Sequence, residues 1–176
     1  MRIRPATVLA LLLSMTALTG ACTEQERRPE SPAESEEWPG KAEQEDAMER
    51  AERALDSTEP DGAARVDEGM ETRPQGLERT FPAKGNRPYT LGVACQAPVT
   101  DRSVTLTLER GAEVSEYEVT CGDREADLFN VPAGAPFTAR ISPDRRDTHV
   151  MVLWRLDTIA PDDVHDCEDD ITGCDD

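Results

Sequence analysis

The chain has 176 residues, and its 37 Asp and Glu against 19 Lys and Arg leave a formal net charge of −18 at pH 7. Proteins that bind nucleic acid carry a basic patch or stripe, so this composition argues against a nucleic-acid partner. The charge is unevenly spread: residues 23–77 carry 17 acidic and 7 basic side chains, residues 78–156 carry 11 and 10, and residues 157–176 carry 9 and none. This distribution predicts an acidic linker, a near-neutral domain and an acidic tail.

Residues 1–21 have the features of a bacterial export signal. Arg2 and Arg4 precede an uncharged apolar run over residues 6–21. That run is shorter than the about 20 apolar residues of a transmembrane helix. A basic start, a short apolar run and small residues before a cleavage point are typical of a secretory signal, so we expect cleavage directly before Cys22.

Cys22 is the expected site of lipid attachment. It ends the segment LTGAC, which is similar to a bacterial lipobox, although Thr19 stands where an aliphatic residue is usual. A diacylglyceryl group on this thiol would supply two acyl chains, and stable membrane anchoring takes two such signals. We therefore expect a lipid-anchored (palmitate-type) protein on the extracellular face of the cell membrane. An ordinary secreted protein cut near residue 21 and an uncleaved anchor are the alternatives.

Residues 22–77 are expected to form a disordered acidic tether, because their low apolar content cannot offset the entropy of ordering. Within them, residues 41–56 are strong helix formers with a thin apolar stripe of Met48, Ala51 and Leu55. Isolated helices of this length are marginal in water, so a frayed, solvated helix is favoured over a partner-docking helix. As a flexible coil the tether would span about 40 Å and hold the domain off the membrane.

Alternating apolar and polar residues predict a β-domain over residues 78–159. No stretch between the expected strands is long and periodic enough for a crossover helix, so the pairing should be antiparallel. The predicted class is all-β: a small antiparallel β-sandwich or a partly open barrel of about six strands. The six predicted strands cover residues 89–95, 104–108, 117–121, 126–131, 137–141 and 150–156.

The four cysteines other than Cys22 are expected to form two disulfides, which persist in exported proteins. Cys95 and Cys121 both fall on inward positions of predicted strands, so we pair them. Cys167 and Cys174 lie close together in the tail and form the second predicted pair. Such disulfides matter because the core of a domain this small rarely contributes more than about 3–5 kcal/mol to the free energy of unfolding.

The sequence shows no motif that would bring a nucleophile and a base together, so we expect no catalytic residue, no cofactor and no metal. Of the two histidines, His165 lies in the tail and His149 at an outward position of the last strand. Trp154 has inward parity and should pack in the core rather than form a ligand platform. Clustered carboxylates over residues 160–176 could bind calcium weakly, but their spacing is not that of an EF-hand, and a solvated acidic tail is favoured.

The layout resembles small surface lipoproteins of actinobacteria, the high-GC Gram-positive bacteria. The resemblance rests on the export signal, the polar tether and the segments YTLGVAC (89–95), VTLTL (104–108), VTCG (119–122) and WRL (154–156). It implies a location and a fold type but no activity. The favoured function is a non-catalytic β-domain displayed for binding. A cation- or solute-binding accessory lipoprotein and a small cell-wall hydrolase or its inhibitor are the alternatives.

Overall fold

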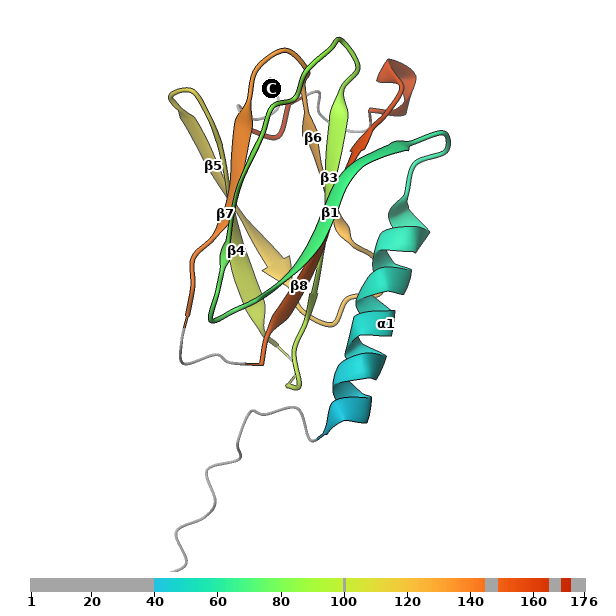
Figure 1. Ribbon diagram of the computed structural model, residues 1–176, viewed down its shortest axis with the longest axis vertical. Coiled ribbons are helices and arrows are strands. Elements are labelled where there is room, and N and C mark those ends of the chain that lie inside the picture. The colour runs from blue at the N-terminus through green and yellow to red at the C-terminus, as the bar shows by residue number, and fades with distance from the viewer. Residues whose placement is uncertain (1–39, 100, 145–148, 165–168, 172–176) are drawn as a thin grey trace, which may run out of the picture. The chain divides into compact units, whose positions relative to one another are not determined.

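The computed structural model describes residues 40–99, 101–144, 149–164 and 169–171. These residues form two four-stranded antiparallel sheets that pack face to face, with one α-helix on the outside (Figure 1). The predicted all-β class and the antiparallel sandwich are confirmed, with eight strands in place of six and no closed barrel. The elements are α1 (Lys41–Thr58), β1 (Ala64–Thr72), β2 (Leu77–Phe81), β3 (Tyr89–Gln96), β4 (Ser103–Arg110), β5 (Glu113–Thr120), β6 (Asp127–Val131), β7 (Phe137–Ile141), β8 (Met151–Thr158) and η1 (Pro161–Asp163).

The strand order is β1-β8-β3-β6 in one sheet, called sheet A here, and β2-β7-β4-β5 in the other, called sheet B. β1 and β2, which are consecutive in the chain, form one edge of the sandwich, each in its own sheet. β5 and β6 form the opposite edge in the same way. Each edge therefore leaves a seam between the two sheets, and each seam is closed by its own set of contacts.

The inner faces of both sheets supply the main core, as period-two alternation predicts. Trp154 of β8 is 1% exposed, which confirms its predicted place in this core. Its ring meets Phe81 edge-on with centroids 5.5 Å apart, and Phe81 lies 5.0 Å from Phe137. At the β1–β2 seam, the guanidinium of Arg79 lies 5.3 Å from the Trp154 ring and pairs with Asp67 at 2.8 Å. The seam on this side is therefore covered by a cation–π contact and an ion pair.

Helix α1 belongs to the same compact unit as the strands, contrary to the tether prediction. It lies on the outer face of sheet A against β3 and β8 and buries Ala47, Ala51, Ala54 and Leu55 (Figure 1). The expectation of a frayed, solvated helix is therefore wrong, because tertiary packing stabilises a helix that would be marginal alone. The helix ends where Glu59, which precedes a proline, takes an extended conformation.

The outer positions of β3 and β8 explain why the helix packs there. All eight residues of β3 are buried, since one face contacts sheet B and the other lies under α1. Gly92 has no side chain and Ala94 has only a methyl group, so α1 can approach the outer face of β3 closely. A Cβ at Gly92 would lie only 3.1 Å from Leu55 Cδ2. Met151 and Leu153 supply the apolar contacts on β8. Where α1 covers them, these strands are thus apolar or small on both faces, which is the sequence signal of a covered sheet.

Strand β1 also lies within the expected tether, so the predicted domain boundary at residue 78 is wrong. It pairs with β8 from Ala64 opposite Thr158 to Thr72 opposite Met151. Its side chains are exposed or half-buried throughout, because it is an edge strand with a single neighbour. Charged side chains are usual on such edges, where they oppose pairing with other chains. The charge that suggested a linker is therefore the charge of a surface strand.

The seam between β5 and β6 is closed by residues 169–171, which belong to the predicted solvated tail. The Asp170 N–H donates to the Asn130 carbonyl at 3.0 Å, and the Asn130 N–H donates to Asp170 Oδ2 at 2.5 Å. Hydroxyl groups of Tyr117 and Ser115 donate to the carbonyls of Asp170 and Ile171. Ile171 is 1% exposed and packs in the main core. For these three residues the solvated-tail prediction is wrong.

The position of Tyr117 in this seam gives a testable titration. Burial, together with the Asp170 carboxylate, raises the pKa of Tyr117 above the usual value of about 10, although Ser115 acts in the opposite direction. Because the folded-state pKa is raised, the associated stability is complete below pH of about 10 and is lost as pH rises through the folded pKa. The absorbance titration of the wild type minus that of Tyr117→Phe should give a pKa above 10. A difference curve centred at or below 10 would contradict this placement.

Cys95 and Cys121 form the predicted disulfide. The bridge joins β3 of sheet A to the residue that follows β5 of sheet B, and both cysteines are buried in the main core. The Gly122 N–H also donates to the Cys95 carbonyl at 2.8 Å. The second predicted pair, Cys167 and Cys174, lies outside the described residues.

Candidate functional site

The described part of the chain contains no group of three or more His, Cys, Asp or Glu side chains arranged to hold a metal ion. His149 lies half-buried in the turn before β8 rather than outward on the strand. Cys22, His165, Cys167 and Cys174 are outside the described residues. Within the described ranges, no helix has the length and apolar character needed to cross a membrane.

Two carboxylates of the predicted calcium-binding tail are described, and both have partners within the fold. Asp169 Oδ1 accepts the Ile171 N–H at 2.9 Å, and Asp169 Oδ2 lies 3.5 Å from Arg110 Nη1. Asp170 Oδ2 accepts the N–H of Asn130 on β6. These two side chains therefore serve to close the β5–β6 seam.

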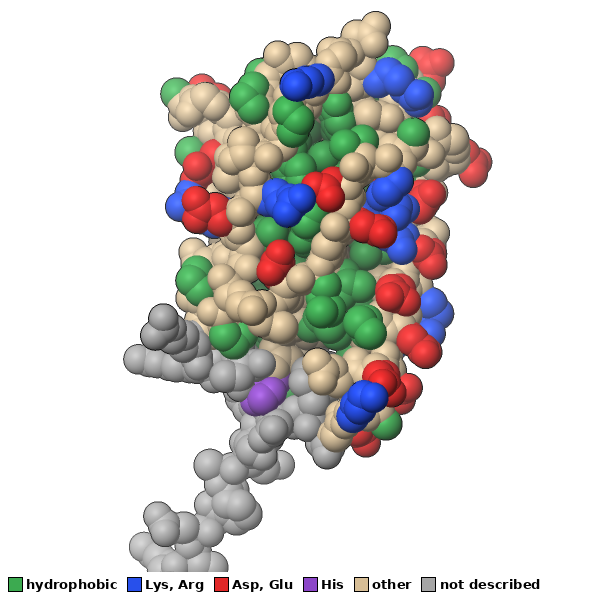
Figure 2. All heavy atoms as spheres, viewed as in Figure 1, with side chains coloured by type: hydrophobic (Ala, Val, Ile, Leu, Met, Phe, Trp, Pro, Cys, Tyr) green, Lys and Arg blue, Asp and Glu red, His purple; other side chains and the backbone are tan. Residues whose placement is uncertain are grey.

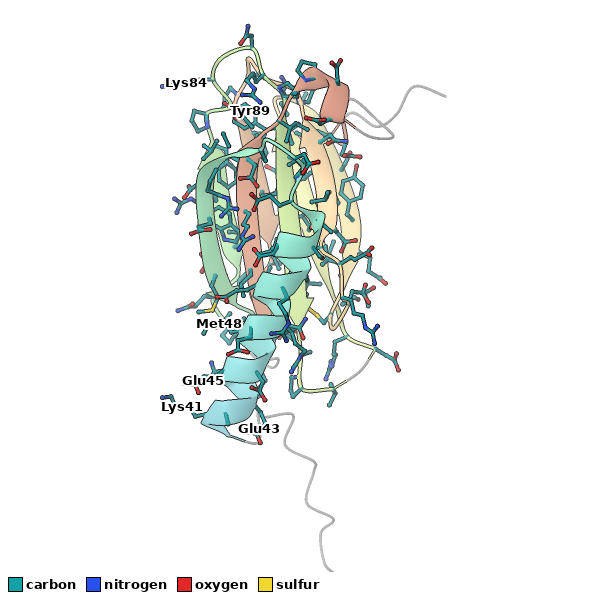
Figure 3. The ribbon with its side chains drawn as sticks, turned by 90° about the vertical axis from the view of Figure 1, so that its right-hand side faces the viewer. Lys41, Glu43, Glu45, Met48, Lys84 and Tyr89 are labelled. Carbon is teal, nitrogen blue, oxygen red and sulfur yellow. A yellow bond between two sulfur atoms is a disulfide. The ribbon has the colours of Figure 1, made fainter. Side chains whose placement is uncertain are left out.

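A groove runs along the outer face of sheet A between α1 and β1, with a volume of about 320 Å³. It exists because α1 covers β3 and β8 and leaves β1 bare beside it (Figure 3). Met48 lies on the side of α1 that faces β1. We call this hollow the α1–β1 groove. Its apolar lining consists of Met48 and Leu55 from α1, Met70 from β1 and Leu153 from β8.

The local structure places these side chains together by simple periodicity. Met48, Glu52 and Leu55 are four and three residues apart on α1, so they share one side of the helix. On the sheet, Met70 stands opposite Leu153, and both point outward because side chains alternate along a strand. Two consecutive elements, α1 and β1, and the distant strand β8 thus contribute to a single apolar surface.

Gly69 separates this groove from the core. It pairs with Trp154, and a Cβ at this position would lie 2.5 Å from Cζ2 of the indole. Such a distance is far below a normal contact, so the indole fills the space that a side chain would need. Both residues line the groove, and binding in the groove should therefore change the environment of Trp154.

An exposed apolar side chain of β1 lines the groove. Met70 is 46% exposed, although it is a large hydrophobic residue, and it stands opposite Leu153 of β8. Exposed apolar surface with a polar rim marks interaction sites on soluble proteins. Methionine suits such a surface because its unbranched, polarizable side chain adapts to different partners.

A network of ion pairs holds one end of the groove together. Arg65 Nε donates to the buried Asp157 carboxylate at 2.7 Å, and its Nη2 lies 2.6 Å from Glu59 Oε2. Burial alone would lower the pKa of Arg65, but the hydrogen bond and charge of Asp157, with Glu59, raise it above its ordinary value. The network links the end of α1 to β1 and β8 and consists of Arg65 and Arg155 with Asp56, Glu59, Glu68 and Asp157.

Negative charge is concentrated on this side of the molecule. α1 carries six carboxylates against three basic side chains, and β1 carries three carboxylates against one arginine. The four strands of sheet B together carry five carboxylates and three arginines, and three of these carboxylates lie on the edge strand β5. In Figure 2, hydrophobic side chains are visible on this face beside acidic and basic ones. The α1–β1 groove is thus an apolar surface with a mainly acidic rim.

A second hollow of about 360 Å³ lies among the loops at the other end of α1 from Lys41, between the β2–β3 loop, the β6–β7 loop and η1. Pro88, Pro132 and Pro161 dominate its lining, and Asn86 supplies the amide there. None of the described residues that line it carries a charge. Recognition in pockets depends on a few placed polar groups, so this hollow offers less basis for specificity than the α1–β1 groove.

Sequence reasoning missed the groove because it assigned α1 and β1 to the tether. Met48 and Leu55 were expected on a solvated helix, and Met70 in a disordered segment. The available signal was on the last predicted strand, where Met151 and Leu153 occupy the outward positions. Apolar residues on both faces of a strand indicate a cover on the outer face, and residues 41–58 contain the helix that provides it.

No known protein family matches the sequence, and no curated protein matches it. Among solved structures, the chain is similar to the capsular polysaccharide assembling protein CapF from Staphylococcus aureus, at 12% identity and a TM-score of 0.33. The match covers 54% of this chain and 25% of that chain, so this chain matches only about a quarter of the other protein's length. A likeness at this level carries no argument about function.

Proposed function

We propose that the protein is a membrane-anchored surface lipoprotein that displays a small, disulfide-stapled β-sandwich for binding and does not act as an enzyme. The observation that carries this proposal is Cys22, placed directly after a basic start and a short apolar run. The Cys95–Cys121 disulfide supports it, because disulfides persist in the oxidising compartments that exported proteins reach.

The position of α1 changes the expected distance between the domain and the membrane. Only residues 23–40 separate Cys22 from the start of α1, instead of the 55 residues of the predicted tether. Fully extended, this segment reaches about 60 Å. A lipid on Cys22 would therefore keep the sandwich much nearer to the bilayer than a 55-residue tether could.

The α1–β1 groove supports a binding role. Its residues are methionine and leucine side chains with carboxylates at the rim, which suit contact with another molecule rather than proton transfer or nucleophilic attack. The ion-pair network and the Gly69–Trp154 contact hold its walls in place. Binding surfaces that are ordered beforehand lose less entropy when a partner binds.

The anchor is tested by replacing Cys22 with Ala in cells of a Gram-positive host fed radiolabelled palmitate. The wild type should be labelled and recovered with membranes, whereas Cys22→Ala should lose the label to background because no thiol remains for the thioether. Thr23→Ala changes the next residue and should behave as the wild type. Equal labelling and equal membrane recovery of the wild type and Cys22→Ala would overturn the lipid anchor.

A further inference from the structure

We infer that the α1–β1 groove binds a cationic amphipathic helix of a partner protein. The inference rests on the proposed function as a displayed binding domain, and it adds the place of binding and the chemistry of the partner. It is carried by the apolar lining, the acidic rim and the direction of the groove along α1.

The lining fits the apolar face of a helix. Met48 and Leu55 stand about two turns apart along α1, and Met70 and Leu153 face them from the sheet. An amphipathic helix that enters a groove presents anchors at i, i+3 or i+4 and i+7, so its contacts also extend over about two turns. α1 is 18 residues long, about 27 Å, and gives such a helix a wall of sufficient length to lie against.

The rim selects the charge of the partner. Glu52 from α1 and Glu68 from β1 line the groove, and Arg155 is the basic side chain in the lining. Arg155 already lies beside the carboxylates of Asp56, Glu59 and Glu68, so its charge is compensated within the domain. Glu68 is itself paired with Arg65, but the ion-pair network holds four carboxylates against two arginines and so keeps a negative excess. Lysine or arginine side chains that flank apolar anchors would complement this excess and Glu52, whereas an acidic helix would be repelled.

The groove is also free of cover in the described fold. β1 is an edge strand whose neighbour is β8, and α1 packs on β8 and β3 rather than on β1. The exposed side chains of Met70 and Val66 lie on this strand. Helix α1 covers the two inner strands of sheet A, β8 and β3, so a second helix can lie beside it and bury β1.

The test uses the mature chain from residue 22 with Cys22→Ser, which removes the lipid, and Trp38→Phe, which leaves Trp154 as the single tryptophan. The probe is an 18-residue helical peptide with leucines at i, i+3, i+4 and i+7 spacing and lysines on the other face. A second peptide carries glutamates in place of the lysines. Binding is measured by calorimetry and by the fluorescence of Trp154. The lysine peptide should bind at least about tenfold more tightly than the glutamate peptide.

Three variants locate the contact. Met70→Glu should weaken the lysine peptide about tenfold even though it adds a negative charge, because it removes an apolar anchor. Glu52→Lys should weaken the lysine peptide and strengthen the glutamate peptide. Val114→Glu, at a 58% exposed position of β5 in sheet B, is the matched control and should bind as the parent does. Circular dichroism should show the same fold in all four proteins.

Two outcomes would overturn the inference. Binding of the lysine peptide that is equal in the parent and in Met70→Glu would show non-specific attraction to an acidic protein. A dimer of the parent that Met70→Glu dissociates would assign the groove to a second copy of this chain. Because the protein in the test carries no lipid, failure here leaves the anchor proposal intact, and failure of the palmitate experiment leaves this inference intact.

Discussion

Replacing Ala51 with Asp should lower the free energy of unfolding by about 3–5 kcal/mol. Ala51 is fully buried between α1 and sheet A, in a cluster with Ala94 and Leu153. A carboxylate at this place would lack a partner in an apolar contact, and an unpaired buried charge is strongly destabilising. Urea unfolding followed by circular dichroism and by tryptophan fluorescence measures the change.

The matched control is Glu49→Asp, which introduces the same side chain on the exposed side of the same helix. Its effect should stay within about 0.5 kcal/mol, as is usual for surface substitutions. Equal, small effects of Ala51→Asp and Glu49→Asp would mean that α1 is solvated, as composition alone suggested. The comparison therefore decides whether α1 is part of the folded domain.

Removing the Cys95–Cys121 bridge should lower the free energy of unfolding by an amount similar to the effect of Ala51→Asp. The double variant Cys95→Ala/Cys121→Ala is expected to lose about 3.5 kcal/mol, because the bridge closes a loop with a sequence separation of 26 and so restricts the unfolded chain. The melting temperature should fall by roughly 10–20 °C. Differential scanning calorimetry under oxidising conditions measures the fall.

Replacing both cysteines avoids a free thiol that could pair with another cysteine. The same double variant should also lose less stability on addition of a reductant than the wild type does, because its principal bridge is already absent. A melting temperature within about 2 °C of the wild type would contradict a stabilising role for this disulfide. The second predicted pair, Cys167 and Cys174, would then need its own double variant.

The strands over residues 89–158 could be predicted well because alternation is a strong signal wherever one face is buried. The predicted segment 89–95 falls within β3 and 104–108 falls within β4. The predicted segment 137–141 has the same bounds as β7. Cys95 and Cys121 could be paired for the same reason, since inward positions on the two facing sheets bring two thiols together. Boundaries differ by a few residues where turns rather than core contacts end a strand.

The segments with the most charge were predicted least well. Residues 41–58 and 64–72 carry half of the acidic excess of the supposed tether, yet they form α1 and β1. A helix that buries only alanines and one leucine has a weak apolar signal, and an edge strand has one neighbour and a charged surface. Residues 169–171 were not predicted to belong to the folded domain, because a single isoleucine among carboxylates does not show periodicity.

The sequence by itself determined the all-β class, the antiparallel sandwich, the Cys95–Cys121 pairing and the expectation of a lipid at Cys22. These depend on local patterns: alternation, parity and a short export motif. Only the tertiary structure decided that α1 covers β3 and β8, that residues 169–171 close the β5–β6 seam, and that a groove remains beside β1. These features depend on contacts between segments far apart in the chain. Small residues such as Gly92 and Ala51 permit those contacts, but they produce no apolar pattern by which the sequence could predict them.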